Sequence, residues 1–297
     1  MKRRMHPNEI NLDTELVRGL VSRQFPAWEE LPIEFVAQGT VNAMYRLGDD
    51  IVVRLPFVEQ GAGGIAREAI WLPRLAPRLD APIPAVLGIG EADAHYPCPW
   101  LVLNWLPGSH PVPDQLDDPD GLAADLAGFI SDLRRIDTHG APNGYRGGSL
   151  AALDAPVREC LGQLVDLIDA AALTAIWEES LAAPAWTGPP VWLHCDLLVG
   201  NVLVAGGRLS GILDFATAGI GDPACDLMAA WSILPSDSRL VLREALWADD
   251  ASWARGRGWA LSQAAIALPY YRDSNPFMAE SSLHILRELE RPDSAPG

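Results

Sequence analysis

The chain has almost no lysine. Of its 297 residues only Lys2 is a lysine, so nearly every cationic side chain available to an anion is an arginine. No Gly-Lys-Ser/Thr triplet follows the glycines at residues 61–64, which excludes a P-loop and leaves them as a flexible entry to a helix. Basic residues are few: 22 against 39 acidic ones, a net charge of −17. This charge argues against nucleic acid or an anionic membrane as the main partner. It is compatible with a cationic substrate, and the alternative is that acidity only keeps the protein soluble.

Cysteines and long apolar runs are also scarce. The four cysteines show no C-x-x-C pair and no zinc-like spacing with histidine, so free thiols in a reducing cytosol are expected. Polar residues follow the basic start, where a signal peptide would be apolar. The uncharged run 94–113 is broken by prolines and cannot form a membrane helix. A cytoplasmic protein with no membrane partner is expected.

The positive signal is a set of three polar residues. Asn201 lies five residues after Asp196, and Asp214 lies eighteen residues after it, inside the apolar segment 211–215. Residues 202–204 and 209–213 predict a hairpin that fixes this spacing. Phosphoryl transfer requires one carboxylate that orients a hydroxyl, together with an amide oxygen and a second carboxylate for magnesium. A chance scatter of polar residues between two strands is the alternative.

The N-terminal third predicts a small sheet. Helical periodicity covers residues 12–25, and a second helix around residues 65–75 is expected to kink or end at Pro73. Strand patterns occur at residues 33–36, 43–47, 51–55, 86–89 and 100–103. These elements predict a small N-terminal lobe over residues 1–104.

The rest of the chain is predicted to be mainly helical. After a loop at 107–121, helical patterns cover residues 120–138, 157–181, 223–233, 238–248, 252–268 and 277–290. The predicted fold class is therefore α+β, with a small N-terminal antiparallel-sheet lobe. The larger, mainly helical C-terminal lobe is predicted over residues 105–297 and contains Asp196, Asn201 and Asp214.

Around these residues the chain resembles the aminoglycoside and macrolide phosphotransferase family, antibiotic kinases with a bilobal, protein-kinase-like fold. The family's His-Gly-Asp loop corresponds to residues 194–196, where Cys195 takes the position of the glycine. The family's Gly-Asp-Pro followed by Asp-Leu is present at residues 221–223 and 226–227. The resemblance covers residues 33–289 and implies the same two-lobed fold. It also implies that residues 1–104 form a nucleotide-binding lobe and residues 105–297 a catalytic and acceptor-binding lobe.

The resemblance implies roles for the catalytic residues. Asp196 is the expected catalytic aspartate, and Asn201 and Asp214 are expected to ligate Mg²⁺ through hard oxygen atoms. Because a carboxylate is a weak base at neutral pH, Asp196 is expected mainly to orient the hydroxyl. His194 and Asp226 are expected to support the loop, His194 by hydrogen bonds and Asp226 by accepting backbone N–H groups.

The cation expected at the nucleotide phosphates is an arginine. Where kinase-like enzymes place a lysine on the third strand this chain has Arg54, with Glu68 from the following helix as its expected partner. A guanidinium can bridge two phosphates, whereas an ammonium is a point charge. A surface ion pair is the alternative. Backbone N–H groups of the 39–43 turn and the Thr40 or Asn42 side chain are also expected at the phosphates, with an ordinary turn as the alternative.

Residues 100–108 match the family's interlobe hinge. The resemblance implies that the purine edge pairs with backbone groups of Asn104 and Leu106, in front of Leu103. Backbone recognition leaves little trace in side chains, so both ATP and GTP stay open as the co-substrate.

The acceptor site is expected on the C-terminal helices, as in the family. Residues 105–297 carry a net charge of −14, against −3 for residues 1–104. Acidic side chains would bind amino sugars, and an aromatic wall would suit a macrolide or a nucleoside. Acceptor residues predicted on this basis are Asp249, Asp250, Asp273, Glu280 and Trp231. Solvated acids and core tryptophans are the alternatives at these positions.

Three functions are compatible with the sequence. The leading hypothesis is a Mg²⁺-dependent phosphotransferase that moves the γ-phosphate of ATP or GTP to a hydroxyl of a small-molecule antibiotic, giving resistance or self-protection. The second keeps this chemistry with choline, homoserine or a sugar as the acceptor. The third is a catalytically silent kinase-like binding protein, against which the intact set of Asp196, Asn201 and Asp214 argues. A protein kinase is disfavoured because no activation segment of usual length follows Asp214.

Overall fold

The computed structural model of the chain describes residues 6, 8–291 and 293. They form two compact units. The first contains the chain up to Arg78 together with Pro82–Pro107 and Gly211–Ala216, and the second contains Leu79–Ala81, Gly108–Ser210 and the chain from Thr217. The predicted division into lobes 1–104 and 105–297 stays a proposal.

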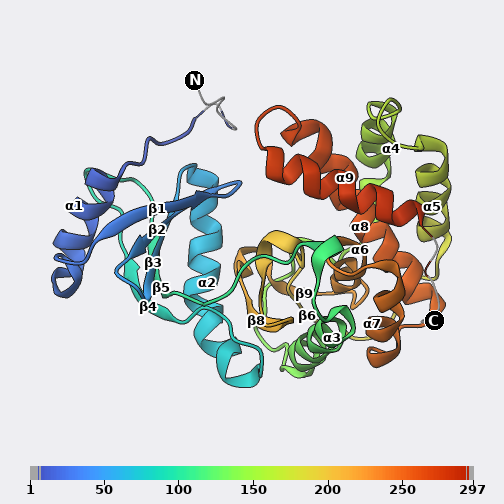
Figure 1. The fold of residues 1–297 in the computed structure, drawn as a ribbon, viewed down its shortest axis with the longest axis horizontal. Coiled ribbons are helices and arrows are strands. Elements are labelled where there is room, and N and C mark those ends of the chain that lie inside the picture. The colour runs from blue at the N-terminus through green and yellow to red at the C-terminus, as the bar shows by residue number, and fades with distance from the viewer. Residues whose placement is uncertain (1–5, 7, 292, 294–297) are drawn as a thin grey trace. The chain divides into compact units, whose positions relative to one another are not determined.

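The first unit is built on a five-stranded antiparallel sheet (Figure 1). The strand order is β1-β2-β3-β5-β4, and hairpins join β1 to β2 and β2 to β3. Its helices and strands are α1 (Thr14–Gln24), β1 (Ile33–Gln38), β2 (Asn42–Leu47), β3 (Ile51–Pro56), α2 (Ala62–Leu75), β4 (Val86–Gly90) and β5 (Trp100–Asn104).

Helix α2 packs on strands β4 and β5 of this sheet (Figure 1). Its buried face repeats at helical spacing through Ile65, Glu68, Leu72 and Leu75, so one carboxylate lies among apolar side chains. Pro73 lies inside the helix, which ends two residues later. The apolar face of α2 therefore fixes where Glu68, the one acid among the buried residues of this helix, meets the sheet.

The second unit is mainly helical. Strands β6 and β9 pair antiparallel, and β7 and β8 form a hairpin around a Gly206-Gly207 turn in which both glycines have positive φ. Its elements are α3 (Pro119–Arg135), α4 (Asp154–Gly162), α5 (Ala170–Ala182), β6 (Val191–Leu193), β7 (Val202–Ala205), β8 (Arg208–Ile212, whose end belongs to the first unit), β9 (Gly219–Gly221), α6 (Ala229–Ser232), α7 (Arg239–Ala245), α8 (Asp250–Tyr271) and α9 (Pro276–Glu290).

The predicted α+β class, with an antiparallel sheet followed by a mainly helical region, is confirmed. The single helix predicted over 157–181 is wrong. Two helices form because Asp169 caps a new one, its carboxylate accepting from the N–H groups of Ala171 and Ala172. The helix predicted over 223–233 is also wrong: a 3₁₀ turn at Cys225–Met228 leads into the short α6.

Several large aromatic side chains lie in the core. Trp100 is fully buried in the first unit, and Trp192 and Trp231 are fully buried in the second. Others are exposed, and Trp247 is exposed to 91%. All four cysteines are free thiols. In the described part of the chain, no helix combines the length and apolarity needed to span a membrane.

Candidate active site

The loop that follows β6 is held by a buried carboxylate. Asp226 is fully buried, and its two oxygens accept from the backbone N–H groups of His194 and Cys195, both at 2.8 Å. Burial raises the pKa of Asp226, and these hydrogen bonds oppose the rise. The contact fixes the backbone immediately before Asp196.

His194 packs inside this loop. Its ring is fully buried and meets the Phe129 ring edge-on at 6.4 Å. Its Nδ1 accepts from the backbone N–H of Asp196 at 3.3 Å, and its carbonyl accepts from the Thr217 hydroxyl at 3.1 Å. The ring therefore faces the protein interior, in contact with backbone.

Asp196 and Asn201 lie against each other, although five residues separate them. The amide nitrogen of Asn201 donates to the Asp196 carbonyl at 2.8 Å and to its carboxylate Oδ2 at 2.9 Å. A 3₁₀ turn, Val199–Asn201, folds the chain back to make this contact. With its nitrogen used, Asn201 has its amide oxygen left to bind a cation.

Two loop residues have backbone angles that favour glycine. Cys195 has φ of 69° and Asp214 has φ of 60°. Such strain concentrates at functional sites. The glycine slot predicted at Cys195 is thus a left-handed position that a cysteine occupies.

In the first unit, Arg54 joins two carboxylates. Its Nη1 donates to Glu68 at 2.5 Å and its Nη2 to Asp214 at 2.7 Å. The Arg54 side chain is 7% exposed and that of Glu68 is 1% exposed, so the alternative of a surface ion pair is wrong. The Asp214 side chain is 37% exposed. Arg54 is therefore a buried cation that links β3, α2 and the 214–216 segment.

Burial and charge act against each other in this cluster. Burial works to lower the pKa of Arg54, but the charges of Asp214 and Glu68 raise it above its usual value. Burial raises the pKa of Glu68 to about 7; Arg54 opposes this rise and Asp214 adds to it. The positive charge of Arg54 thus stabilises the ionised form of the buried Glu68 carboxylate.

Asn42 also faces Arg54. When its amide is oriented as the surrounding groups require, its oxygen accepts from Arg54 Nη2 at 2.8 Å and from Nε at 3.1 Å. Asn42 is 5% exposed. The nearby Thr40 carbonyl contacts the His6 ring nitrogen at 2.7 Å. Every nitrogen of the Arg54 guanidinium therefore has a protein acceptor.

Helix α2 approaches the 214–216 segment closely. A Cβ added at Gly64 would lie 2.8 Å from the Ala216 Cβ. The Phe215 N–H donates to Glu68 at 2.9 Å. Glycine at position 64 thus allows α2 to hold the backbone beside Asp214.

The hinge residues lie at the end of β5. The Asn104 N–H donates to the Ala85 carbonyl at 3.1 Å, and the Ala85 N–H donates to the Asn104 side chain at 2.6 Å. The side-chain oxygen thereby replaces the Asn104 main-chain carbonyl as the acceptor for Ala85. Leu106 lies two residues beyond, in the irregular segment before Pro107.

The predicted acceptor residues have different environments. Asp249 caps α8 by accepting from the Ser252 N–H, and Asp250 pairs with Arg243. Trp231 is fully buried and has no surface exposed to an acceptor. Asp273, between α8 and α9, and Glu280, on α9, are exposed.

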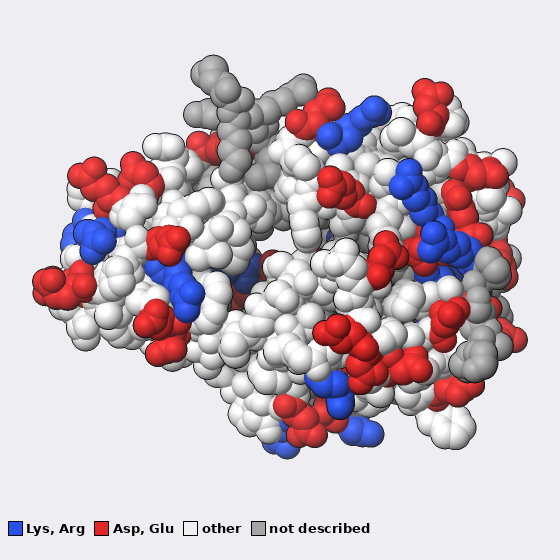
Figure 2. Space-filling model, viewed as in Figure 1, with Lys and Arg blue, Asp and Glu red and all other residues white. Residues whose placement is uncertain are grey.

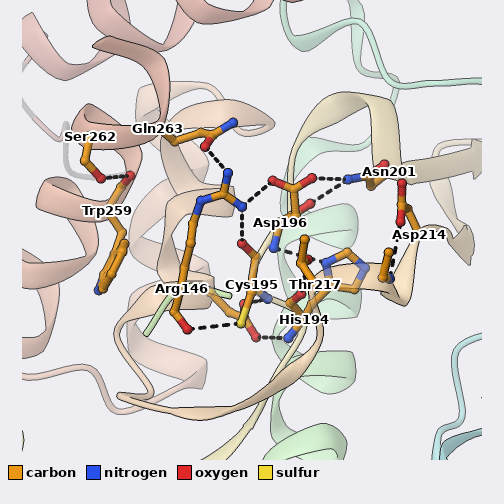
Figure 3. A network of polar contacts seen from close by, with 12 residues as sticks. Arg146, His194, Cys195, Asp196, Asn201, Asp214, Thr217, Trp259, Ser262 and Gln263 are labelled. Carbon is orange, nitrogen blue, oxygen red and sulfur yellow. Dashed lines mark hydrogen bonds and ion pairs between the residues drawn. The ribbon is translucent and has the colours of Figure 1, made fainter. Parts of the chain in front are cut away.

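Three residues that sequence reasoning missed lie at or near the loop of residues 194–201. Arg146 donates to Asp196 at 2.9 Å and also to the side chain of Gln263 on α8 (Figure 3). Phe277 on α9 is 49% exposed and lies against Gly200, where an added Cβ would be 3.2 Å from its ring. No spacing rule joins these residues to the 194–201 motif, because they are distant in sequence.

The model of the phosphotransferase enzyme family (APH) matches residues 32–259. The chain belongs to this family. The resemblance inferred from the catalytic loop is thereby confirmed. A search of curated protein sequences finds no match to this chain.

Solved structures share its fold. The GDP and kanamycin complex of APH(2")-IIia is 22% identical, with a TM-score of 0.74 over 92% of this chain and 98% of the other. ADP-bound aminoglycoside phosphotransferase APH(2'')-Ib is 16% identical, with a TM-score of 0.62 over 94% and 98%. The macrolide 2'-phosphotransferase MphH from Brachybacterium faecium is 24% identical, with a TM-score of 0.59 over 92% and 97%. The predicted protein-kinase-like fold is therefore confirmed.

Proposed function

We propose that this phosphotransferase moves the γ-phosphoryl group of a nucleoside triphosphate to a hydroxyl of a small-molecule antibiotic, with Mg²⁺ as cofactor. The contact between Asp196 and Asn201 carries the proposal. One amide group orients the carboxylate through its nitrogen and keeps its oxygen for a cation. A hydroxyl-orienting carboxylate beside a hard oxygen ligand is the arrangement that phosphoryl transfer uses.

In the proposed reaction, Asp196 accepts a hydrogen bond from the acceptor hydroxyl. The hydroxyl oxygen forms a bond to the γ-phosphorus while the bond from this phosphorus to the β–γ bridging oxygen breaks. The electron pair of that bond leaves with the nucleoside diphosphate, and the hydroxyl proton passes to the Asp196 carboxylate. His194 and Asp226 are proposed to hold the loop backbone, which their contacts with residues 194–196 support.

The donors of the chain fit Mg²⁺. Asn201 and Asp214 each supply a hard oxygen, and within the described ranges no group of three or more His, Cys, Asp or Glu could hold a metal alone. Mg²⁺ binds through one or two protein oxygens together with phosphates and water, so a larger protein cage is not required. When bound, it would neutralise phosphate charge. Asn201 and Asp214 are the residues proposed to hold it.

Arg54 is proposed as the cation at the nucleotide phosphates. Because its nitrogens already have protein acceptors, a phosphate oxygen must share or replace one of them. Asp214 is the most exposed of the three partners and is the proposed point of exchange, while Glu68 and Asn42 keep the guanidinium in place. Thr40 and the backbone of its turn are proposed as further phosphate contacts.

The purine is proposed to pair with the Asn104 carbonyl and the Leu106 backbone. The use of the Asn104 side chain as the acceptor for Ala85 supports the first of these contacts. One structural neighbour is a GDP complex and another is ADP-bound, so ATP and GTP both belong in the test.

The acceptor is proposed to bind beside α9. Kanamycin in one neighbour and the macrolide named for another support an antibiotic as the acceptor. Phe277 lies against the catalytic loop and Glu280 is about one turn further along the helix. These two residues, with Asp273, are the proposed acceptor contacts. Asp249 and Asp250 lie thirteen or more residues before Gln263, which is about 20 Å along α8. Because of this distance they are not among the proposed acceptor contacts.

The test is a phosphotransfer screen with radiolabelled ATP and GTP, with and without Mg²⁺. Acceptors are aminoglycosides, macrolides, nucleoside antibiotics, choline, homoserine and sugars. Wild-type protein is compared with Asp196→Ala and with Asp166→Ala, an exposed aspartate of the same unit that serves as the control. We expect Mg²⁺-dependent transfer to one antibiotic class, lost in Asp196→Ala and kept in Asp166→Ala. Expression in a sensitive bacterium should then raise the inhibitory concentration of that antibiotic.

Other outcomes select other functions. Transfer to choline, homoserine or a sugar alone identifies a metabolite kinase. Nucleotide binding without transfer to any acceptor or to water, unchanged by Asp196→Ala, identifies a silent binding protein and refutes the proposal.

A further inference from the structure

Arg146 is charge-paired with the proposed catalytic aspartate. Its Nη1 donates to the Asp196 Oδ1 and to the Cys195 carbonyl, both at 2.9 Å (Figure 3). The side chains of Arg146 and Asp196 are 17% and 22% exposed. The pair is thus partly shielded from water, so it is stronger than an ion pair at the surface.

Asp196 is held from two sides. Arg146 contacts Oδ1, and the Asn201 amide contacts Oδ2 at 2.9 Å. With one oxygen fixed, the carboxylate could still turn about the line to that partner; the second contact removes this freedom. A reacting group misplaced by about 1 Å can lose two orders of magnitude in rate, so such double anchoring matters for the reaction.

Arg146 is itself anchored by Cys195. The Cys195 thiol donates to the Arg146 carbonyl at 3.4 Å, while the Cys195 carbonyl accepts from the Arg146 guanidinium. The left-handed backbone of Cys195, with φ of 69°, accompanies both contacts. The residue that departs from the family's glycine therefore ties the Arg146 backbone and side chain to the catalytic loop.

A third contact connects Arg146 to helix α8. Its Nη2 donates to the Gln263 side chain. The exposed Tyr145 ring lies 5.2 Å from the Arg146 guanidinium. The guanidinium thus has partners on the catalytic loop, on α8 and in its own loop, which leaves it little freedom to swing away.

We propose that Arg146 is a positioning residue of the phosphotransfer reaction, which holds the Asp196 carboxylate in the orientation that receives the acceptor hydroxyl. The inference rests on the proposed function. Arg146 does not touch the reacting atoms; it acts through Asp196. An ion pair that only ties two loops together would stabilise the fold and leave turnover unchanged once the protein is folded.

The experiment measures steady-state transfer and nucleotide hydrolysis for full-length wild type, Arg146→Ala, Arg146→Lys and Gln263→Ala. We expect Arg146→Ala to lower kcat about 100-fold while the nucleotide KM stays within about twofold. Arg146→Lys should lower kcat about tenfold, because a single ammonium group replaces the several N–H donors of the guanidinium. Gln263→Ala keeps both Asp196 contacts and should lose about threefold. Millimolar guanidinium should restore part of the Arg146→Ala activity.

The control is Arg208→Ala, which breaks an ion pair with Asp125 at the surface of the same unit and should keep wild-type kcat. Circular dichroism checks that each variant is folded. A folded Arg146→Ala protein with wild-type kcat overturns the inference, as does a kcat loss that neither guanidinium nor Arg146→Lys restores. Wild-type protein without any transfer or hydrolysis overturns the proposed function as well, so the two failures are distinguishable.

Discussion

Replacing Arg54 with methionine should destabilise the first unit strongly. Methionine fills a similar volume without charge, so the variant leaves Glu68, 1% exposed, with only the Phe215 N–H as a partner. Removing one member of a buried ion pair costs about 3–5 kcal/mol. Because the Phe215 N–H contact remains, we expect Arg54→Met to lower the unfolding free energy by about 3 kcal/mol. This loss corresponds to a fall in Tm of about 6 °C for a chain of this size.

Two further variants separate charge from geometry. Arg54→Lys keeps the charge and should cost about half as much, because the contacts with Asn42 need the fork of the guanidinium. Adding Glu68→Gln to Arg54→Met removes the unpaired buried acid and should recover about 1–2 kcal/mol of the loss. Arg23→Met breaks a half-exposed pair with Asp93 in the same unit and should cost at most about 1 kcal/mol.

The measurement is chemical or thermal unfolding followed by circular dichroism. The reasoning fails if Arg54→Met is no less stable than Arg23→Met, since burial would then have no effect on the ion pair. It also fails if the effects of Arg54→Met and Glu68→Gln simply add, since the two residues would then not interact.

Three other substitutions test particular contacts. Gly64→Ala should lower the unfolding free energy by about 1–3 kcal/mol, because its Cβ would meet Ala216 at 2.8 Å; Gly63→Ala, with open space around it, should raise it by up to about 1 kcal/mol. Equal effects of Gly64→Ala and Gly63→Ala on the unfolding free energy, measured in urea, would contradict this. Cys195→Gly should be about 1 kcal/mol more stable than Cys195→Ala, because only glycine relieves a φ of 69°; the opposite order would refute the strain. Burial lowers the pKa of His284 below 6.5, so the unfolded state binds more protons and stability should fall as the pH drops below about 6.5. His284→Asn should flatten that slope, and an unchanged slope would contradict the assignment.

Local sequence signals account for the loop that brings Asp196 and Asn201 together. Asp196 and Asn201 lie within one strand-loop-strand segment, so spacing and turn glycines are enough to bring them together. The first-unit sheet was predictable for the same reason, because hairpins join neighbours in the chain. Arg54 was predicted through the family resemblance, from its position on the third strand, but its burial was not predicted.

Arg146 could not be predicted in this way. It lies 50 residues before Asp196 and 117 before Gln263, in a glycine-rich loop without periodicity. Sequence alone also fails to say which side of an element faces solvent. Trp231 is fully buried although an acceptor role was predicted for it, and Trp247 is exposed. The helix at residue 250 did carry a readable signal, since Asp249 three residues before Ser252 is a typical N-cap.

The acidity of the second unit has structural causes that weaken it as evidence for a cationic acceptor. On the face seen in Figure 2, acidic side chains outnumber basic ones and many lie beside them. Asp118, Asp169 and Asp249 cap helices, while Asp222 and Glu288 pair with buried arginines. Such acids stabilise the fold and are not available to a substrate. The surfaces proposed at the acceptor combine an exposed ring with a few acids, so acceptors that carry little charge fit this pattern as well as aminoglycosides do, and the acceptor must be decided by the screen.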